Sequence, residues 1–348
     1  MFLRDNWYVA AWSDEVGRTP LARTVLGEDL LLYRTQAGAA IVLENRCAHR
    51  RLPLSLGRLV GDTVECAYHG LVYDETGRCT KIPGQDPPRN VGVKAYPVVE
   101  RDQFVLVWMG APARADPAKV ISFPRLADRD WGVTKVRLHV AGNFLLILDN
   151  LLDLSHVAYV HGTTIGNAAV AENAEVKFSQ SGNMIRVTRE MSSVLAARTY
   201  AEFGPHAGIF DRWQISEYRP PGYFLINNGS GKCGWATTDG SSRLDTQGEW
   251  GFQVYHCITP ETEKTSHQFW ALAHELNAVP PEGRPEFYRQ SHQVILEDQV
   301  VYEAQQRSLD TDPAGASAEN VGTRVVIGAD RGLQMARRLL SELQTGSA

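Results

Sequence analysis

The sequence predicts an α+β protein of two domains, and three observations support this. The chain has 348 residues, which is more than one hydrophobic core usually serves. Short apolar runs separated by Gly, Pro and Asp dominate the first hundred or so residues, a pattern typical of β-structure. In the remainder, strand-like stretches come first and long helical patterns come last, which indicates antiparallel strands packed with helices.

The first domain is expected to consist of β-strands alone. Its clearest runs are residues 29–34, 39–43 and 104–109. The segment GAPARADPAKVISFP at 110–124 is rich in Ala and Pro and is typical of a linker. We place the boundary near residue 115, which gives domains of residues 1–115 and 116–348.

The second domain is expected to combine a sheet with helices. Alternating or apolar runs predict strands at 134–140, 184–190, 212–219, 223–228, 249–259 and 266–274. Helical periodicity is visible at 142–160, 284–309 and 321–345.

Composition excludes several classes of protein. The net charge is −5 and no basic block occurs, which argues against nucleic-acid binding. The N-terminal MFLRDNWYVAAW lacks the features of a signal peptide, and no run of about 18 apolar residues predicts a membrane span. We therefore expect a soluble cytoplasmic protein. Its five cysteines are too sparse for a disulfide framework.

Two cysteines are paired with histidines at short spacing. Cys47 and His49 form C-x-H, and after sixteen further residues Cys66 and His69 form C-x-x-H. Zinc fingers usually place both cysteines in one half of the site and both histidines in the other. Here each half supplies one of each, which favours a [2Fe–2S] Rieske cluster, with two Cys on one iron and two His on the other. Zinc, or four unrelated buried residues, remain the alternatives.

The other three cysteines have no histidine at ligand spacing. Cys79, Cys233 and Cys257 are interpreted as core or surface thiols.

A second cluster of metal-capable residues lies in the segment 149–162. Asp153 and His156 are three residues apart and would share one face of a helix. His156 and His161 are five apart, about 140° around an ideal helix of 3.6 residues per turn. A regular helix would not direct both imidazoles at one metal, so we expect the helix to distort or end near His161. Gly162 supports an end there.

Two histidines need a carboxylate to form the 2-His-1-carboxylate site of non-haem iron(II) enzymes. Our candidate is Asp298, because it shares an apolar helical stripe with Val294, Val301 and Tyr302. A carboxylate facing the core requires a partner such as a metal. Glu297, at the edge of the stripe, is the weaker candidate. Ordinary core histidines and a solvated helix charge are the alternative interpretation.

The sequence around the first cluster resembles a known domain. The stretches NRCAHRRLPLSLG (45–57) and ECAYHGLVYDETGRCTKIPGQ (65–85) closely resemble the Rieske domain of aromatic-ring oxygenases. That family usually has Pro where this chain has Ala48, a change that alters loop stiffness without removing a ligand.

The second cluster extends the resemblance over nearly the whole chain. N-L-x-D-x-x-H-x-x-x-x-H (150–161), VYHCITPETE (254–263) and ILEDQVVYEAQQ (295–306) are similar to the vanillate and dicamba O-demethylase group. The resemblance implies an N-terminal all-β Rieske domain. It also implies a C-terminal antiparallel-sheet domain of helix-grip, START-like form, which holds a mononuclear Fe(II).

The resemblance also implies how the parts cooperate. The oxygenase would be a homotrimer in which the cluster of one subunit faces the iron of its neighbour. Asp153 would bridge them, accepting hydrogen bonds from His69 across the interface and from His156. Asn150 would lie beside the iron. NAD(P)H would supply electrons through a separate flavin and ferredoxin-type reductase, since no GxGxxG fingerprint stands out here.

Substrate contacts are predicted on two strands. Alternation places His256 on an apolar face with Phe252 and Val254, and Asn228 on a face with Ile226. A His matching His256 contacts substrate in the dicamba-type enzymes; a backbone-bonded core histidine is the alternative.

The resemblance implies O-demethylation of a vanillate-like methoxylated aromatic acid with O₂, releasing formaldehyde. Methyl hydroxylation, ring hydroxylation or N-demethylation by the same machinery is the alternative, and a Rieske electron-transfer protein is the alternative outside enzymes.

Overall fold

The computed structural model describes residues 2–205, 208–234, 249–321 and 325–346. The chain divides into two compact units. The first comprises Met1–Ser122 together with Thr259–Glu263, and the second comprises Phe123–Ile258 and Lys264–Ala348. The boundary therefore falls seven residues after the predicted position 115. The first unit also includes a short segment that the sequence assigned to the second, because Leu26 N donates to Pro260 O and Thr259 Oγ1 donates to Val9 O.

The first unit is built from three small antiparallel sheets, as its short apolar runs predicted. The orders are β1-β10-β9, β2-β3-β4 and β5-β6-β7-β8. Their strands are β1 (Trp7–Trp12), β2 (Leu21–Val25), β3 (Glu28–Arg34), β4 (Ala40–Glu44), β5 (Arg58–Val60), β6 (Thr63–Glu65), β7 (Val72–Tyr73), β8 (Cys79–Lys81), β9 (Val98–Arg101) and β10 (Phe104–Trp108).

Two cores stabilise this unit. One contains the inward residues of the first two sheets, among them Leu30, Leu32 and Val107. The other contains Cys47 and Cys66 together with buried Leu and Tyr side chains. The second core therefore lies directly beneath the Cys/His loops.

The linker forms a succession of short turns. The 3-10 turns η3 (Pro112–Arg114), η4 (Pro117–Lys119) and η5 (Pro124–Leu126) each begin with proline, whose fixed φ suits the first position of a helical turn.

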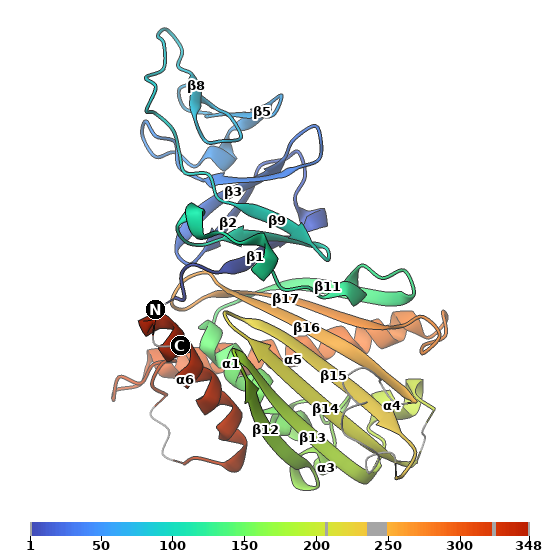
Figure 1. The fold of residues 1–348 in the computed structure, drawn as a ribbon. Coiled ribbons are helices and arrows are strands. Elements are labelled where there is room, and N and C mark those ends of the chain that lie inside the picture. Colours follow the sequence, from blue (N-terminus) through green and yellow to red (C-terminus); the bar gives the residue numbers. More distant parts are fainter. Residues whose placement is uncertain (1, 206–207, 235–248, 322–324, 347–348) are drawn as a thin grey trace. The chain divides into compact units, whose positions relative to one another are not determined.

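The second unit is centred on one seven-stranded antiparallel sheet of order β11-β17-β16-β15-β14-β13-β12 (Figure 1). Its strands are β11 (Trp131–Val140), β12 (Glu175–Ser181), β13 (Met184–Leu195), β14 (Ile209–Arg219), β15 (Tyr223–Gly231), β16 (Trp250–Pro260) and β17 (Ser266–Glu275). Every predicted strand of this domain is present. The close approach of β14 and β15 depends on Gly229, since a Cβ there would lie 2.3 Å from the Trp213 ring.

Helices pack on this sheet, which confirms the α+β class. They are α1 (Phe144–Leu152), α2 (Val157–Val160), α3 (Ala168–Glu172), α4 (Arg198–Phe203), α5 (Arg284–Asp310) and α6 (Arg331–Thr345). Figure 1 shows the long helix α5 crossing behind the strands, the helix-grip arrangement that the resemblance implied. In the described residues α1 packs against both α5 and α6.

Two helical predictions need correction. The expected helix at 142–160 is broken at Asp153, whose φ of −115° and ψ of 91° are extended rather than helical. The expected helix at 321–345 begins only at Arg331 in the described residues, after a 3-10 turn at Gly328–Asp330. The β-branched run Val325–Ile327 lowers helix propensity there; positions 322–324 of that prediction lie outside the described residues.

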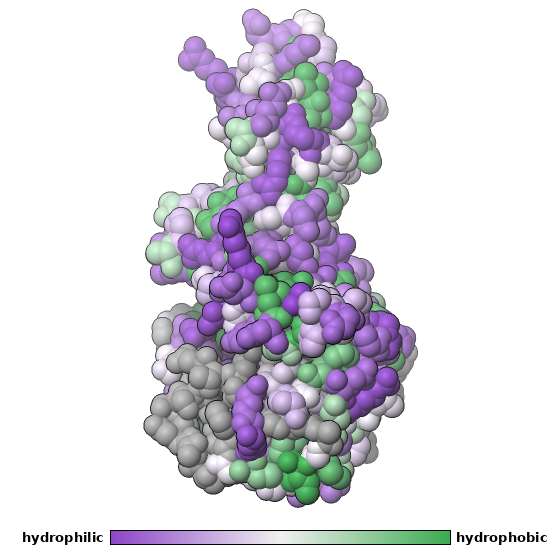
Figure 2. All heavy atoms as spheres, turned by 90° about the vertical axis from the view of Figure 1, so that its right-hand side faces the viewer, coloured by the Kyte–Doolittle hydropathy of each residue, from purple (hydrophilic) through white to green (hydrophobic). Residues whose placement is uncertain are grey.

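The surface drawn in Figure 2 is mostly hydrophilic, and the apolar side chains visible on this face occur in small separate groups. Among the residues that the structure describes, no helix combines the length and the apolarity needed to cross a membrane.

Candidate functional site

The two Cys/His loops of the first unit have the same backbone design. Cys47 N donates to Leu52 O, and Cys66 N donates to Leu71 O, five residues further on in each case. The amide of the fourth residue after each cysteine donates back to that cysteine's carbonyl. That fourth residue, Arg51 or Gly70, has a positive φ of 62° or 68°. The C-x-H and C-x-x-H segments therefore project from two equivalent turns.

These turns bring all four predicted cluster residues together. The thiols of Cys47 and Cys66 are buried in one core, whereas His49 and His69 are exposed with their Nδ1 atoms 3.2 Å apart. The paired nitrogens suit one iron and the two thiols suit the other. The exposed imidazoles would leave one edge of such a cluster open to an electron-transfer partner.

A tyrosine completes the first site. The hydroxyl of Tyr73 lies 3.2 Å from Cys47 Sγ and accepts a hydrogen bond from Ala48 N at 3.1 Å. The loop position where the family usually has Pro is therefore held by a backbone hydrogen bond that proline could not donate.

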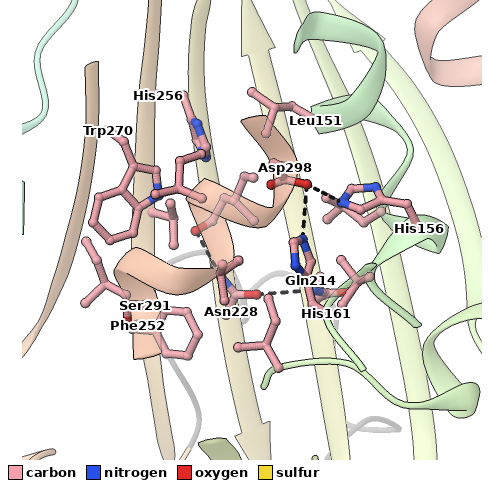
Figure 3. Close-up of a pocket in the computed structure, with 18 residues that line it drawn as sticks. Leu151, His156, His161, Gln214, Asn228, Phe252, His256, Trp270, Ser291 and Asp298 are labelled. Atoms are coloured by element: carbon pink, nitrogen blue, oxygen red, sulfur yellow. Dashed lines mark hydrogen bonds and ion pairs between the residues drawn. The ribbon is translucent and has the colours of Figure 1, made fainter. Parts of the chain in front are cut away.

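The second unit brings together His156, His161 and Asp298, and their ligand atoms all lie within 4.8 Å of one another. Asp298 Oδ1 is 3.1 Å from His161 Nε2 and 3.4 Å from His156 Nε2 (Figure 3). Two imidazole nitrogens and one carboxylate oxygen on one side of a cavity fit the donor set of a non-haem Fe(II) site.

The break in the helix explains how two histidines five residues apart can converge. Helix α1 ends at Leu152, a 3-10 turn runs from Leu154 to His156, and α2 ends at Val160. His161 follows as the C-cap of α2 with non-helical φ and ψ of −110° and 26°. This confirms the expectation that no regular helix continues through the motif.

The carboxylate comes from the middle of α5. Asp298 is 5% exposed, and Asn150 Nδ2 donates to its Oδ1 at 3.2 Å. Burial raises the pKa of Asp298, but hydrogen bonds from His156 and His161 outweigh this effect and hold the pKa well below its usual range. A deprotonated oxygen is therefore available for a metal.

Glu297, the weaker candidate for the metal-binding carboxylate, lies behind His161. Its Oε2 accepts a hydrogen bond from His161 Nδ1 at 2.8 Å, on the opposite side of the ring from Asp298. Burial lowers the pKa of His161, but the two flanking carboxylates raise it more. Glu297 thus orients His161, as carboxylates behind metal-binding histidines commonly do.

Asp153 departs from the predicted contact with His156. His156 Nδ1 donates to the backbone carbonyl of Asp153 at 2.6 Å, and no hydrogen bond to the carboxylate is seen in the described residues. The carboxylate instead caps the following turn by accepting from Ser155 N at 2.9 Å. Arg189, 3% exposed, has Nη1 3.9 Å from Asp153 Oδ1.

A cavity in the described residues is lined by all three members of the His156, His161 and Asp298 cluster. Its apolar wall is supplied by α1, α5 and the sheet, including Leu151, Phe252 and Trp270 (Figure 3). It encloses about 60 Å³. A cavity of roughly 150 Å³ binds benzene, so lining side chains would have to move before an aromatic ring could enter this one.

Both predicted substrate residues, His256 and Asn228, line this cavity, and each is hydrogen-bonded to another polar side chain. His256 is joined to two residues that the sequence did not single out for the site: Gln268 Nε2 donates to His256 Nδ1 at 3.0 Å, and Tyr302 OH donates to Gln268 Oε1 at 3.2 Å. An amide nitrogen can only donate, so Nδ1 accepts and the proton resides on Nε2. Burial lowers the pKa of His256 to about 4, which keeps the ring neutral.

Asn228 is paired across the sheet with Gln214, which sequence reasoning missed. Gln214 Nε2 donates to Asn228 Oδ1 at 3.3 Å. Strand β14 is buried on both faces around this position, so alternation of polar and apolar residues gave no signal there.

Comparisons with known proteins agree with this architecture. Residues 6–97 match the model of the Rieske [2Fe-2S] domain, and residues 140–345 match that of the vanillate O-demethylase oxygenase C-terminal domain. The chain is 36% identical over 348 residues to the toluene-4-sulfonate monooxygenase system iron-sulfur subunit of Comamonas testosteroni, covering 99% of this chain and 97% of that protein.

One further relative is named a demethylase, and a similar solved structure is named a monooxygenase. The vanillate O-demethylase oxygenase subunit of a Pseudomonas species is 32% identical over 314 residues, covering 89% of this chain and 87% of the relative. The crystal structure of dicamba monooxygenase bound to dicamba superposes with a TM-score of 0.87 at 29% identity, covering 99% and 98% of the two chains.

A Rieske domain joined to a sheet-and-helix domain with a His/His/carboxylate cluster defines the oxygenase component of a Rieske monooxygenase system. The chain belongs to the Rieske oxygenase family, in the group that has the vanillate O-demethylase C-terminal domain. The resemblance, the fold class and the Rieske cluster predicted from the sequence are confirmed.

Proposed function

We propose that this oxygenase component O-demethylates a methoxylated aromatic acid of the vanillate type. The observation that carries the proposal is the position of His156, His161 and Asp298 at the wall of a mainly apolar cavity. The three side chains would hold Fe(II), and Cys47, Cys66, His49 and His69 would hold the Rieske cluster. When bound, the iron supplies activation of O₂ with electrons that pass through the cluster.

The chain's own residues would bind and orient the substrate. The apolar wall would pack against an aromatic ring once lining side chains move aside, and His256 presents Nε2–H as a fixed donor to an anionic or ether oxygen. One O atom then enters a methyl C–H bond and the other leaves as water, using two electrons and two protons. The hydroxymethyl ether formed is a hemiacetal, which collapses to a phenol and formaldehyde.

The electrons require a second protein. Relatives are named as the oxygenase component or the iron-sulfur subunit of larger systems, which supports a reductase partner. We propose a flavin and ferredoxin-type reductase that oxidises NAD(P)H, and a homotrimer in which Asp153 links the cluster of one subunit to the iron of the next. Localisation in the cytoplasm stays a prediction.

Methyl hydroxylation is the second candidate, because the 36% identical relative is named toluene-4-sulfonate monooxygenase. The two reactions share the same first step, oxidation of a methyl carbon. They differ in product: a benzylic alcohol is stable, whereas a hydroxymethyl ether is not.

The test uses a panel of methoxybenzoates and methylbenzenesulfonates with a surrogate reductase and NADH. We expect formaldehyde from at least one methoxybenzoate and about three irons per chain, two in the cluster and one mononuclear. The Asp298→Asn variant should keep about two irons per chain and should release no formaldehyde. Benzylic alcohol without formaldehyde would establish the second candidate, and full formaldehyde release by Asp298→Asn would exclude the iron site.

A further inference from the structure

Gln214 supplies a buried acceptor that has no partner. Its side chain lines the cavity and is 2% exposed, yet Oε1 makes no hydrogen bond in the described structure (Figure 3). A buried acceptor without a partner is destabilising, and native structures rarely contain one unless a ligand or water occupies the site.

The orientation of this amide follows from its neighbours. Asn228 Nδ2 faces the carbonyl of Ile226 at 3.5 Å, so Asn228 Oδ1 faces Gln214. Only the nitrogen of Gln214 can donate to that oxygen, and it does so at 3.3 Å. Rotating the Gln214 amide by half a turn would oppose two oxygens. The cross-strand pairing of Gln214 with Asn228 therefore occupies Nε2 and leaves Oε1 as the unpaired atom of a side chain that lines the cavity.

This acceptor lies at the opposite end of the cavity from His256. On β15 and β16 Asn228 pairs with Phe252 and Phe224 pairs with His256, so the two polar ends are four residues apart along the strands. At about 3.3 Å per residue this offset is roughly 13 Å along the strands, and Gln214 on β14 also lies two strands across from His256 on β16. Side chains reaching in from both ends shorten this gap, and a substituted ring would lie between them once lining side chains move aside.

We infer that Gln214 is a specificity-determining residue whose Oε1 accepts a hydrogen bond from a donor on the substrate, namely a phenolic hydroxyl, an amine or an amide N–H. The inference rests on the proposed function and narrows the class of substrate that the enzyme would accept. The substrate carries an acceptor group for His256 and, across the ring, a donor for Gln214. An acid whose ring bears only methoxy or halogen groups would leave the Gln214 oxygen unpaired.

The experiment measures binding without turnover, by calorimetry of the iron-loaded oxygenase under anaerobic conditions. The probes are methoxybenzoates with a hydroxyl or amino group at each ring position, and each is paired with its O-methyl or fluoro counterpart. We expect the donor member of at least one pair to bind about tenfold to a hundredfold more tightly, as a hydrogen bond to a buried acceptor commonly gives. In Gln214→Met, of similar size but without the acceptor, that preference should fall below about threefold.

Two controls make the result specific. Val254→Ala changes the cavity without touching an acceptor and should shift both members of a pair equally. Cluster absorbance and circular dichroism check folding. Should Gln214→Met not fold, Gln214→Leu replaces it, because it also lacks the acceptor and must lose the preference.

Equal binding within every pair overturns the inference and means that only water satisfies Gln214, while formaldehyde release from methoxybenzoates would still uphold the proposed function. A donor preference that survives in Gln214→Met also overturns it. If no methoxybenzoate binds, the proposed function fails and the inference fails with it.

Discussion

Glu297 accepts a hydrogen bond from His161 Nδ1 at 2.8 Å while the other nitrogen of the same ring faces Asp298. Adjacent acidic residues on α5 thus have different roles around one imidazole. Asp298 is available to the metal, and Glu297 fixes the ring orientation and the tautomer from behind.

Glu297→Gln should therefore weaken iron binding without removing a ligand. Loss of the carboxylate behind a metal-binding histidine typically costs tenfold to a hundredfold in affinity. Iron per chain after dialysis against a graded series of chelator concentrations measures this. Glu286→Gln, in the first turn of the same helix and away from His161, is the matched control and should behave as wild type in iron retention. Equal iron retention in the two variants would contradict the role of Glu297.

Asp153→Asn should keep both metal centres and lose at least about 90% of turnover, because the proposed contact with the partner subunit's His69 depends on the carboxylate charge, whereas His156 is held by the Asp153 carbonyl. The amide oxygen can still cap the turn at Ser155, so the fold is preserved. The direct measurement is the rate at which the prereduced cluster is reoxidised in the presence of substrate and O₂, followed by its visible absorbance. Wild-type reoxidation with full metal content would refute the bridge.

Gln268→Leu should raise the KM for an anionic aromatic substrate about tenfold, since one charge-assisted hydrogen bond is worth roughly 1.5–3 kcal/mol. Without the Gln268 donor, nothing holds the His256 proton on Nε2, and the ring can adopt either neutral tautomer. Gln268→Glu should have at least as large an effect, because a carboxylate draws the proton to Nδ1. Both variants should retain iron. Unchanged KM values would show that the His256–Gln268–Tyr302 chain only supports packing.

The buried His256 also predicts a stability that falls in mild acid. Burial lowers its pKa from 6.5 to about 4, so between these values the unfolded chain binds a proton that the native protein does not. Stability contributed by this group is complete above pH 6.5 and decreases as the pH falls toward 4, by about 3 kcal/mol in total. Urea midpoints of the second unit at pH 7 and pH 5 measure it. His256→Gln should show a smaller difference between the two pH values, and an identical pH dependence would contradict the neutral ring.

Local sequence patterns predicted the residues that come together at the two sites and the break in the helix near His161. The spacing of Cys47, His49, Cys66 and His69 indicated the cluster because each short turn delivers one thiol and one imidazole. The five-residue separation of His156 and His161 correctly required a broken helix. Asp298 was found because a carboxylate on an apolar stripe is unusual.

Tertiary structure alone decided the contacts that cross between elements. Glu297 and Asp298 are neighbouring carboxylates on α5, and only the packing of α5 against the segment around His161 places them on opposite sides of one ring. Gln214 gave no signal because β14 is buried on both faces, so its function depends on its cross-strand partner Asn228. A sequence records periodicity along one element, whereas a hydrogen bond between residues 14 positions or 136 positions apart depends on how those elements pack.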